Sequence, residues 1–350
     1  MNSLWKPYCD ALIMEMRQKS EDVRDRNVMS IFIGGGTPSL IPYILIERIM
    51  EGARRFYNIL CDAEISIESN PGTLDQEKLK AYREAGINRL SMGLQAHQDH
   101  ILKFLGRIHT AKQFDEAVFL AKNNGFSNIN ADIIFGIPNQ TFFDWRDTVS
   151  RILEFEIPHV SCYSLKIEEG TEFGKLKEKG MLEEADDILD RKMYHHAINV
   201  LGKAGVAQYE ISNFAKPQNR CLHNMNYWLR GEYLGFGSAA HSFINEERFA
   251  NISDVRRYMK SVKDGSIELS ERDTINKEEA LSESMILGLR LNEGVNLDYL
   301  SSTYQLDVGD KYREKLKMLY GKNLVDLDGA MVRLTEKGMD FANQVFVEFI

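Results

Sequence analysis

The stretch SIFIGGGTPSLIP, residues 30–42, decides how this chain is expected to fold. Its β-branched apolar run predicts a strand, and the three glycines after it predict a turn with bare backbone before a helix that Pro38 opens. The spacing fits neither a dinucleotide-binding GxGxxG turn nor a phosphate-binding P-loop. Two interpretations stay open: a tight strand-to-helix turn, or a backbone that offers its N–H groups to a ligand.

Strand and helix patterns alternate from this strand onward, which predicts βαβ units and a parallel sheet of about six strands. The predicted strands cover residues 28–34, 63–69, 87–93, 128–136, 159–167 and 206–214, and the predicted helices cover 43–57, 74–86, 111–125 and 142–156. Such a sheet is either a complete or partial barrel or an open doubly wound sheet. We favour the barrel, because polar residues gather at the ends of successive strands.

Four of these polar residues are candidate ligand contacts. Glu68 ends a strand before Pro-Gly and suits a ribose diol or an ammonium group, although a cap or a surface pair explains it equally well. Gln95 adds an amide, and Arg107 adds a guanidinium that could also be a solvated surface group. Asp132 is harder to explain structurally, because a charge inside an apolar strand is costly unless it is paired or used.

Residues 220–243 crowd histidines, aromatic residues and glycines into a stretch that looks like a loop. His223 is either a packed or capping imidazole or a ligand of a metal or porphyrin. In the second case Tyr227 and Trp228 supply a flat apolar wall.

The bulk composition excludes several classes of protein. A net charge of −9 over 350 residues, with no basic run, argues against nucleic acid as a partner. Neither a signal peptide nor an apolar run long enough to span a membrane is present, so we expect a cytoplasmic protein. The four cysteines, at positions 9, 61, 162 and 221, form no CxxC pair and are expected to be reduced thiols.

The chain length predicts two domains, which we place at residues 1–250 and 251–350. The composition becomes charged and helical after residue 250. The tail has the pattern of a short hairpin followed by a helix, which is typical of a winged helix. It lacks a basic recognition helix, so we expect a small, mostly α-helical packing or lid domain.

Several motifs occur together in the order of one known family: GGGTPS, IESNPGT, SMGLQAHQDHILKFLGRIH, NADIIFGIPNQT, YSLKIEEGTEF, YEISNFA and HNMNYWLRGEYLGFGSAAHSF. The chain resembles the oxygen-independent coproporphyrinogen III oxidase-like proteins, and within them most nearly the HemW-type heme chaperones of the radical S-adenosylmethionine (SAM) superfamily. The resemblance covers nearly the whole chain. It implies a partial (β/α) barrel of radical SAM type and a C-terminal domain like that of coproporphyrinogen oxidase.

The resemblance also implies cofactors and contacts. Gly35, Gly36 and Thr37 would bind the methionine end of S-adenosyl-L-methionine, while Glu68, Gln95, Arg107 and Asp132 would contact the same pocket, with Lys166 and His241 at weaker positions. His223 and Tyr227 belong to the His-Asn-x-x-Tyr signature and would contact heme. The implied partners are heme and the proteins that receive it, with a homodimer and a peripheral membrane contact left open.

The family also holds a 4Fe-4S cluster through a Cys-x3-Cys-x2-Cys loop, and no three cysteines here have that spacing. Cys9 aligns with the helix beyond that loop, so we expect the first barrel strand and the loop to lie upstream of residue 1. A misplaced start codon, a truncated gene and a cluster-free form all explain this.

Three functions follow from the resemblance. The first is a heme chaperone, which the HNMNYW segment favours. The second is the radical-mediated oxidative decarboxylation of coproporphyrinogen III, which needs the cluster, so we expect the chain as given to be inactive in it. The third is a cluster-free interaction protein.

Overall fold

The computed structural model describes residues 2–350 and divides the chain into two compact units. The middle unit comprises Ile31–Tyr43 and Glu64–Arg220. The terminal unit comprises Met1–Ser30, Ile44–Ala63 and Cys221–Ile350. None of the helices in residues 2–350 is long and apolar enough to cross a bilayer.

A seven-stranded sheet, curled into a half-barrel, organises the fold and confirms the predicted partial barrel. In sheet order its strands are β1 (Asn27–Ile33), β2 (Asn58–Ser69), β3 (Arg89–Gln95), β4 (Asn128–Phe135), β5 (His159–Ser164), β7 (Asn213–Ala215) and β6 (Ala207–Glu210). Strands β2 to β5 are parallel, so their carboxyl ends meet at one edge of the sheet. That edge is where the predicted ligand contacts were expected to gather.

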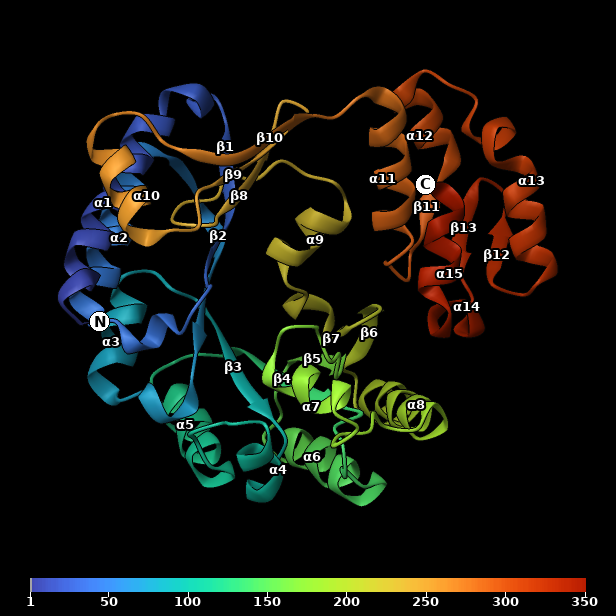
Figure 1. Ribbon diagram of the computed structural model, residues 1–350, viewed down its shortest axis with the longest axis horizontal. Coiled ribbons are helices and arrows are strands. Elements are labelled where there is room, and N and C mark those ends of the chain that lie inside the picture. Colours follow the sequence, from blue (N-terminus) through green and yellow to red (C-terminus); the bar gives the residue numbers. More distant parts are fainter. Residues whose placement is uncertain (1) are drawn as a thin grey trace. The chain divides into compact units, whose positions relative to one another are not determined.

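The helices of the middle unit follow the strands as the alternation predicts, and Figure 1 shows α4, α5 and α6 on one face of β3 to β5. They are α3 (Gln76–Glu84), α4 (Asp99–Phe104), α5 (Ala111–Asn123), α6 (Phe142–Glu154), α7 (Glu172–Glu178) and α8 (Asp187–Lys203), while α2 (Tyr43–Phe56) follows β1. Thr110 and Thr141 begin α5 and α6 with reciprocal capping boxes. These caps explain why the predicted starts at residues 111 and 142 are confirmed.

The prediction of one further parallel strand over residues 206–214 is wrong. The structure splits the segment into β6 and β7, which pair antiparallel, and β7 is also antiparallel to β5. Only two residues separate the two strands, and a connection that short closes a hairpin but cannot make a parallel crossover.

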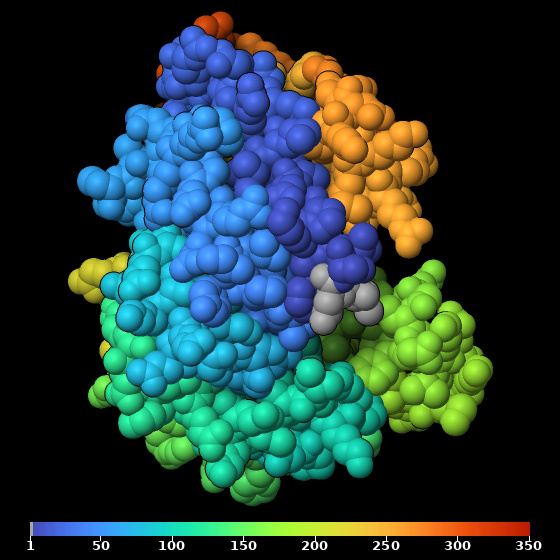
Figure 2. Space-filling model, turned by 90° about the vertical axis from the view of Figure 1, so that its left-hand side faces the viewer, coloured from blue at the N-terminus to red at the C-terminus, as the bar shows by residue number. Residues whose placement is uncertain are grey.

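The terminal unit contains α1 (Trp5–Lys19), α9 (Leu222–Trp228), α10 (Val255–Lys263) and an antiparallel sheet in the order β10-β9-β8. These strands are β8 (His241–Ile244), β9 (Glu247–Asn251) and β10 (Leu269–Thr274). Ala11 of α1 packs with Tyr258 and Val262 of α10, and Figure 2 shows the blue N-terminal segment against the orange segment that includes α10. Residues 220–243 are therefore not only loop, because α9 lies within them. The charged and helical composition after residue 250 also gave no sign of β10, whose residues are mostly polar and exposed.

The C-terminal part of the terminal unit is a set of helices and a small antiparallel sheet. The helices are α11 (Lys277–Gly288), α12 (Leu297–Tyr304), α13 (Val308–Gly321), α14 (Glu336–Asp340) and α15 (Ala342–Phe346). The strands are β11 (Val295–Asn296), β13 (Met331–Leu334) and β12 (Val325–Asp328), in that order across the sheet. The hairpin β12–β13 turns at Gly329, whose φ of +57° suits glycine. It confirms the short hairpin that was predicted in the tail.

Candidate functional site

One face of the parallel strands in the middle unit is polar and largely buried. Alternate residues on a strand share a face, and the strand register places Glu68, Ser91, Asn130 and His159 in one row across β2 to β5. The next row toward the carboxyl ends contains Gly93, Asp132 and Ser161. Buried polar groups are costly unless they are bonded or used, so this face is the strongest candidate for a ligand site in the middle unit.

The triple glycine and Glu68 are joined directly. The backbone N–H of Gly35 donates to Glu68 Oε2 at 3.1 Å. Gly35 and Gly36 adopt φ values of +81° and +149°, and a Cβ added to either would meet no atom within 4 Å, so their backbone is open to a ligand. Burial raises the pKa of Glu68, with Gly35 opposing and Asp132 adding to the shift. Pro38 opens a short 3-10 turn, Pro38–Leu40, rather than α2 itself.

Asp132 is held by its strand neighbours. Asn130 Nδ2 donates to Asp132 Oδ1 at 2.8 Å, and Ser91 Oγ donates to Oδ2 at 3.3 Å. Burial raises the pKa of this carboxyl despite those bonds. Asn130 Oδ1 in turn accepts from Nδ1 of His159 at 2.6 Å, and burial keeps the pKa of that imidazole well below its ordinary value. The neutral imidazole then accepts at Nε2 from the Tyr209 hydroxyl, 2.9 Å away.

Gln95 adopts an unusual backbone conformation at the end of β3. Its φ is +62°, the N–H of Ala96 bonds back to the carbonyl of Leu94 at 2.9 Å, and the pairing of β3 with β4 shifts register at this point. Its side chain is 6% exposed, and Oε1 accepts no hydrogen bond from any of residues 2–350. Strained backbone and an unpaired buried amide oxygen at a strand end are typical of a binding position.

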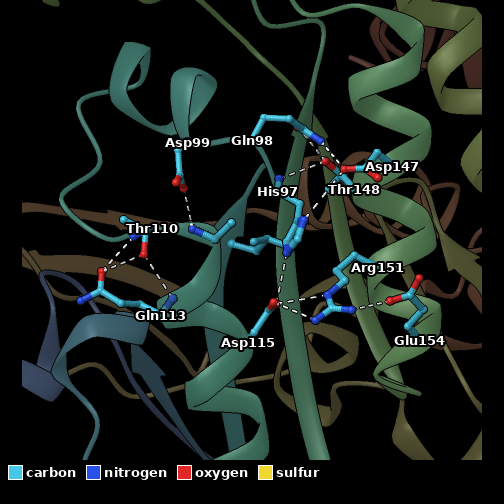
Figure 3. A network of polar contacts seen from close by, with 12 residues as sticks. His97, Gln98, Asp99, Thr110, Gln113, Asp115, Asp147, Thr148, Arg151 and Glu154 are labelled. Carbon is cyan, nitrogen blue, oxygen red and sulfur yellow. Dashed lines mark hydrogen bonds and ion pairs between the residues drawn. The ribbon is translucent and has the colours of Figure 1, made fainter.

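His97 ties the loop after Gln95 to two helices, as Figure 3 shows. Its backbone N–H donates to Thr148 Oγ1 on α6 at 3.0 Å, and its Nε2 lies 3.1 Å from Asp115 Oδ1 on α5. Asp115 also accepts from Arg151 of α6 at 2.7 Å. These contacts fix the segment that follows Gln95, and they help to hold its left-handed conformation.

The other predicted contacts of this pocket are more exposed or lie in the other unit. Thr37 is half-buried and lies just before the 3-10 turn. Arg107 and Lys166 are exposed, and no ion pair joins either to Glu68 or Asp132 in the described part of the chain. His241 lies on β8 in the terminal unit, where it pairs with Glu271 at 3.3 Å. The structure therefore joins Gly35 to Glu68 and brings Asp132 near enough to raise the pKa of Glu68 further.

The second candidate site lies on α9 in the terminal unit. His223 and Tyr227 are four residues apart and share one face of the helix, with the Tyr227 hydroxyl 3.0 Å from His223 Nε2. The other ring nitrogen, Nδ1, lies 3.1 Å from Ser30 Oγ on β1. Tyr233 packs edge-on against the Tyr227 ring, with centroids 4.7 Å apart. Burial raises the pKa of Tyr227 to about 12.

Ion pairs of Arg230 hold the segment that follows α9. Arg230, at a φ of +54°, pairs with Glu246 and with Glu283 of α11, and its side chain is 7% exposed. Its guanidinium also lies 4.6 Å from the Phe243 ring centroid. Trp228 is covered by the guanidinium of Arg290 at 4.2 Å. The C-terminal helices therefore hold the end of α9 in place.

Residues 2–350 offer no ligand set for an iron–sulfur cluster. In that range no three His, Cys, Asp or Glu side chains lie close enough together to hold a metal ion. Cys9, Cys162 and Cys221 are buried and Cys61 is exposed. Burial raises the pKa of Cys9 to about 11, which disfavours the thiolate that metal binding needs. The described residues therefore do not fit the cluster.

Sequence reasoning missed most of the polar face. The missed residues are Arg89, Ser91, Asn130, His159 and Ser161, and all are buried. The sequence does contain a pattern that predicts this face, because polar residues alternate with apolar ones in RLSMG, NINAD and HVSCYS. Ser30 had no such signal, because it lies 193 residues from His223 in the sequence.

Comparisons with known proteins agree with this geometry. Residues 12–152 match the family model of the radical SAM superfamily, and residues 275–341 match the HemN C-terminal domain. The heme chaperone HemW of Bacillus subtilis is 33% identical over 344 residues, which cover 98% of this chain and 91% of that protein. The chain belongs to the HemW family. HemW of Lactococcus lactis is 30% identical over 341 residues, covering 97% of this chain and 89% of the relative.

Membership of the HemW family confirms the resemblance seen in the motifs. The solved structure of coproporphyrinogen III oxidase (HemN) from Escherichia coli, a radical SAM enzyme, superimposes with a TM-score of 0.87. It is 23% identical and covers 100% of this chain and 84% of that chain. This likeness establishes the fold alone, so the reaction of that enzyme is not carried over to this HemW relative.

Proposed function

We propose that the protein is a heme chaperone, which binds heme as its cargo through His223 and passes it to a second protein. The observation that carries this proposal is the setting of His223 on α9, with Nδ1 bonded to Ser30 at 3.1 Å. A histidine that ligates metal commonly donates its other ring N–H to a fixed acceptor, which orients the ring. The relatives' name, heme chaperone, supports the same reading.

Hemin titration followed by the Soret band tests the proposal. We expect the wild type to bind ferric heme with the spectrum of an imidazole-ligated iron, and the His223→Ala variant to lose that signature with at least a ten-fold fall in affinity. His241→Ala is the matched control, because that imidazole is 56% exposed and pairs with Glu271. Equal affinity and an equal Soret position in His223→Ala and wild type would exclude His223 as the ligand.

The polar face of the middle unit is proposed as the seat of S-adenosyl-L-methionine. The open backbone of Gly35 and Gly36, together with Thr37, suits the methionine end, and Glu68 and Asp132 suit the hydroxyl or ammonium groups of the cofactor. The unpaired Oε1 of Gln95 offers a further acceptor. Arg107 is proposed as an outer contact. These residues fit the cofactor, which when bound supplies an adenosyl group.

Calorimetry with S-adenosyl-L-methionine tests the second site. We expect weak binding, because the described residues supply no iron to hold the amino and carboxylate groups of the methionine end. Gln95→Ala should weaken it further, whereas Lys175→Ala, at an exposed surface pair, should not. Tight binding by the wild type would show that the protein groups alone suffice.

The proposed recipient is a protein that takes up heme, and the proposed location is the cytoplasm. Transfer is tested by mixing the heme-loaded protein with apomyoglobin and following the Soret band. Release to this acceptor is expected, and retention of heme against excess acceptor would argue for a resident cofactor.

A further inference from the structure

Both ring nitrogens of His223 carry hydrogen bonds. Nδ1 faces Ser30 Oγ at 3.1 Å, and Nε2 faces the Tyr227 hydroxyl at 3.0 Å. The Tyr227 ring stands nearly perpendicular to the imidazole, with an interplanar angle of 84° and centroids 5.0 Å apart. The nitrogen that would reach iron is therefore occupied by a neighbour on its own helix.

The chemistry of the two hydroxyl groups decides which nitrogen carries the proton. A phenol is a stronger hydrogen-bond donor than an aliphatic alcohol, so Tyr227 donates to the lone pair of Nε2. The proton of the neutral imidazole then lies on Nδ1, and it is donated to Ser30 Oγ. In this arrangement Nε2 is the nitrogen with a lone pair to offer, and Ser30 fixes the tautomer that offers it.

We propose that the Tyr227 hydroxyl is a removable cap on the iron-ligating nitrogen of His223, and that Ser30 holds the imidazole in the tautomer that iron requires. This inference rests on the proposed heme-chaperone function. It changes the expected role of Tyr227 from a contact that helps to bind heme to one that competes with it.

The exchange is balanced and needs no oxidant or reductant. The hydrogen bond from Tyr227 to Nε2 breaks, the lone pair of Nε2 forms a bond to the iron, and the proton stays on the phenol, which bonds to water instead. Rotation of one tyrosine side chain uncovers Nε2. A cap of this kind lowers the affinity for heme, which suits a protein that must release its cargo.

Two substitutions should act in opposite directions. Tyr227→Phe keeps the ring and removes the cap, so ferric heme should bind about five-fold more tightly, the equivalent of one neutral hydrogen bond. Ser30→Ala removes the acceptor at Nδ1, so heme should bind about ten-fold more weakly. Ser30→Thr restores a hydroxyl and should restore the affinity. Tyr299→Phe, which removes the hydroxyl of an exposed ring on α12, should leave the affinity unchanged.

Hemin titration, stopped-flow association and Soret spectra of these variants form the test, with circular dichroism and thermal unfolding to show that each one folds. If Tyr227→Phe binds heme equally or more weakly while His223→Ala loses the imidazole signature, the cap is wrong and the proposed function stands. If Ser30→Ala binds as tightly as wild type, the tautomer assignment is wrong. If His223→Ala retains the wild-type spectrum, the proposed ligand fails, and the cap fails with it.

Discussion

Replacing Glu15 should cost more stability than any surface substitution in the terminal unit. Its carboxylate is fully buried and accepts from Gly237 N at 2.8 Å, Asn251 Nδ2 at 2.7 Å and the Tyr258 hydroxyl at 2.6 Å. It also pairs with Lys19 at 2.7 Å, and the lysine side chain is 10% exposed. Three of these partners join α1 to the turn at Gly237, to β9 and to α10, while Lys19 lies one turn further along α1 itself.

The magnitude of this effect follows from what Glu15→Ala leaves behind. Breaking a buried ion pair from one side costs about 3–5 kcal/mol, and each orphaned donor adds about 1 kcal/mol. Lys19 keeps part of its stabilisation, because Nζ also bonds to the Gly235 carbonyl at 3.2 Å and lies 5.4 Å from the Phe249 ring centroid. The low end of the first range then applies. Asn251 Nδ2 also keeps its bond to the Gly237 carbonyl at 2.8 Å, which leaves two orphaned donors. The expected loss is therefore about 5 kcal/mol.

Urea denaturation followed by tryptophan fluorescence and circular dichroism measures this loss. Glu21→Ala is the matched control, because Glu21 pairs with Arg24 at the surface, where both side chains are about 70% exposed. An exposed pair of this kind contributes at most about 1 kcal/mol. A loss below about 1 kcal/mol for Glu15→Ala would refute the reasoning, since the buried carboxylate would then not hold these elements together.

Three further substitutions probe the other sites. Below about pH 6.5 His159 is protonated in the unfolded chain but stays neutral in the folded chain, so the free energy of unfolding should fall by up to about 1.4 kcal/mol for each unit that the pH is lowered. His159→Gln should flatten this slope in denaturation curves measured at several pH values. Gly34→Ala would place a Cβ 2.8 Å from Cε1 of Phe32 and 3.0 Å from the Glu68 carboxylate carbon, and thermal unfolding should show a loss of about 1–3 kcal/mol. Arg230→Ala removes a partner of Glu283 and should cost about 2 kcal/mol in urea denaturation.

Each of these three predictions has a contradicting result. An unchanged slope between pH 6.5 and 5 in His159→Gln would mean that other groups carry the pH dependence. A Gly34→Ala protein as stable as wild type would mean that the side chains of Phe32 and Glu68 both move aside freely. An Arg230→Ala protein within about 0.5 kcal/mol of wild type would place the pair with Glu283 among surface contacts of little effect.

The regular elements were predictable where one local signal dominated. The starts of α5 and α6 follow from Thr110 and Thr141, whose capping boxes involve residues only three positions away. The hairpin at residues 206–214 was not predicted, because its two-residue turn contains neither glycine nor proline. Helix α9 was missed because it is short and rich in aromatic residues and asparagine, which are weak helix formers.

For the candidate sites, too, local signals predicted some residues, while the contacts between distant residues could not be predicted. Glycine spacing and a carboxylate at a strand end marked Gly35, Glu68 and Asp132, because these signals depend on residue type and on local strand periodicity. The bond from Gly35 to Glu68 spans 33 residues, and the row of polar side chains across β2 to β5 exists only once the strands are in register.

The sequence by itself determined the main strands and helices from β1 to β5, the partial barrel they form, the family and the identity of His223 as a residue to test. Only the tertiary structure decided that Gln95 is left with an unpaired buried oxygen and that Ser30 and Tyr227 occupy the two nitrogens of His223. The physical reason is that secondary structure and motifs arise from neighbours in the chain. The partner of a side chain is set instead by packing, which brings Ser30 beside a histidine 193 residues away.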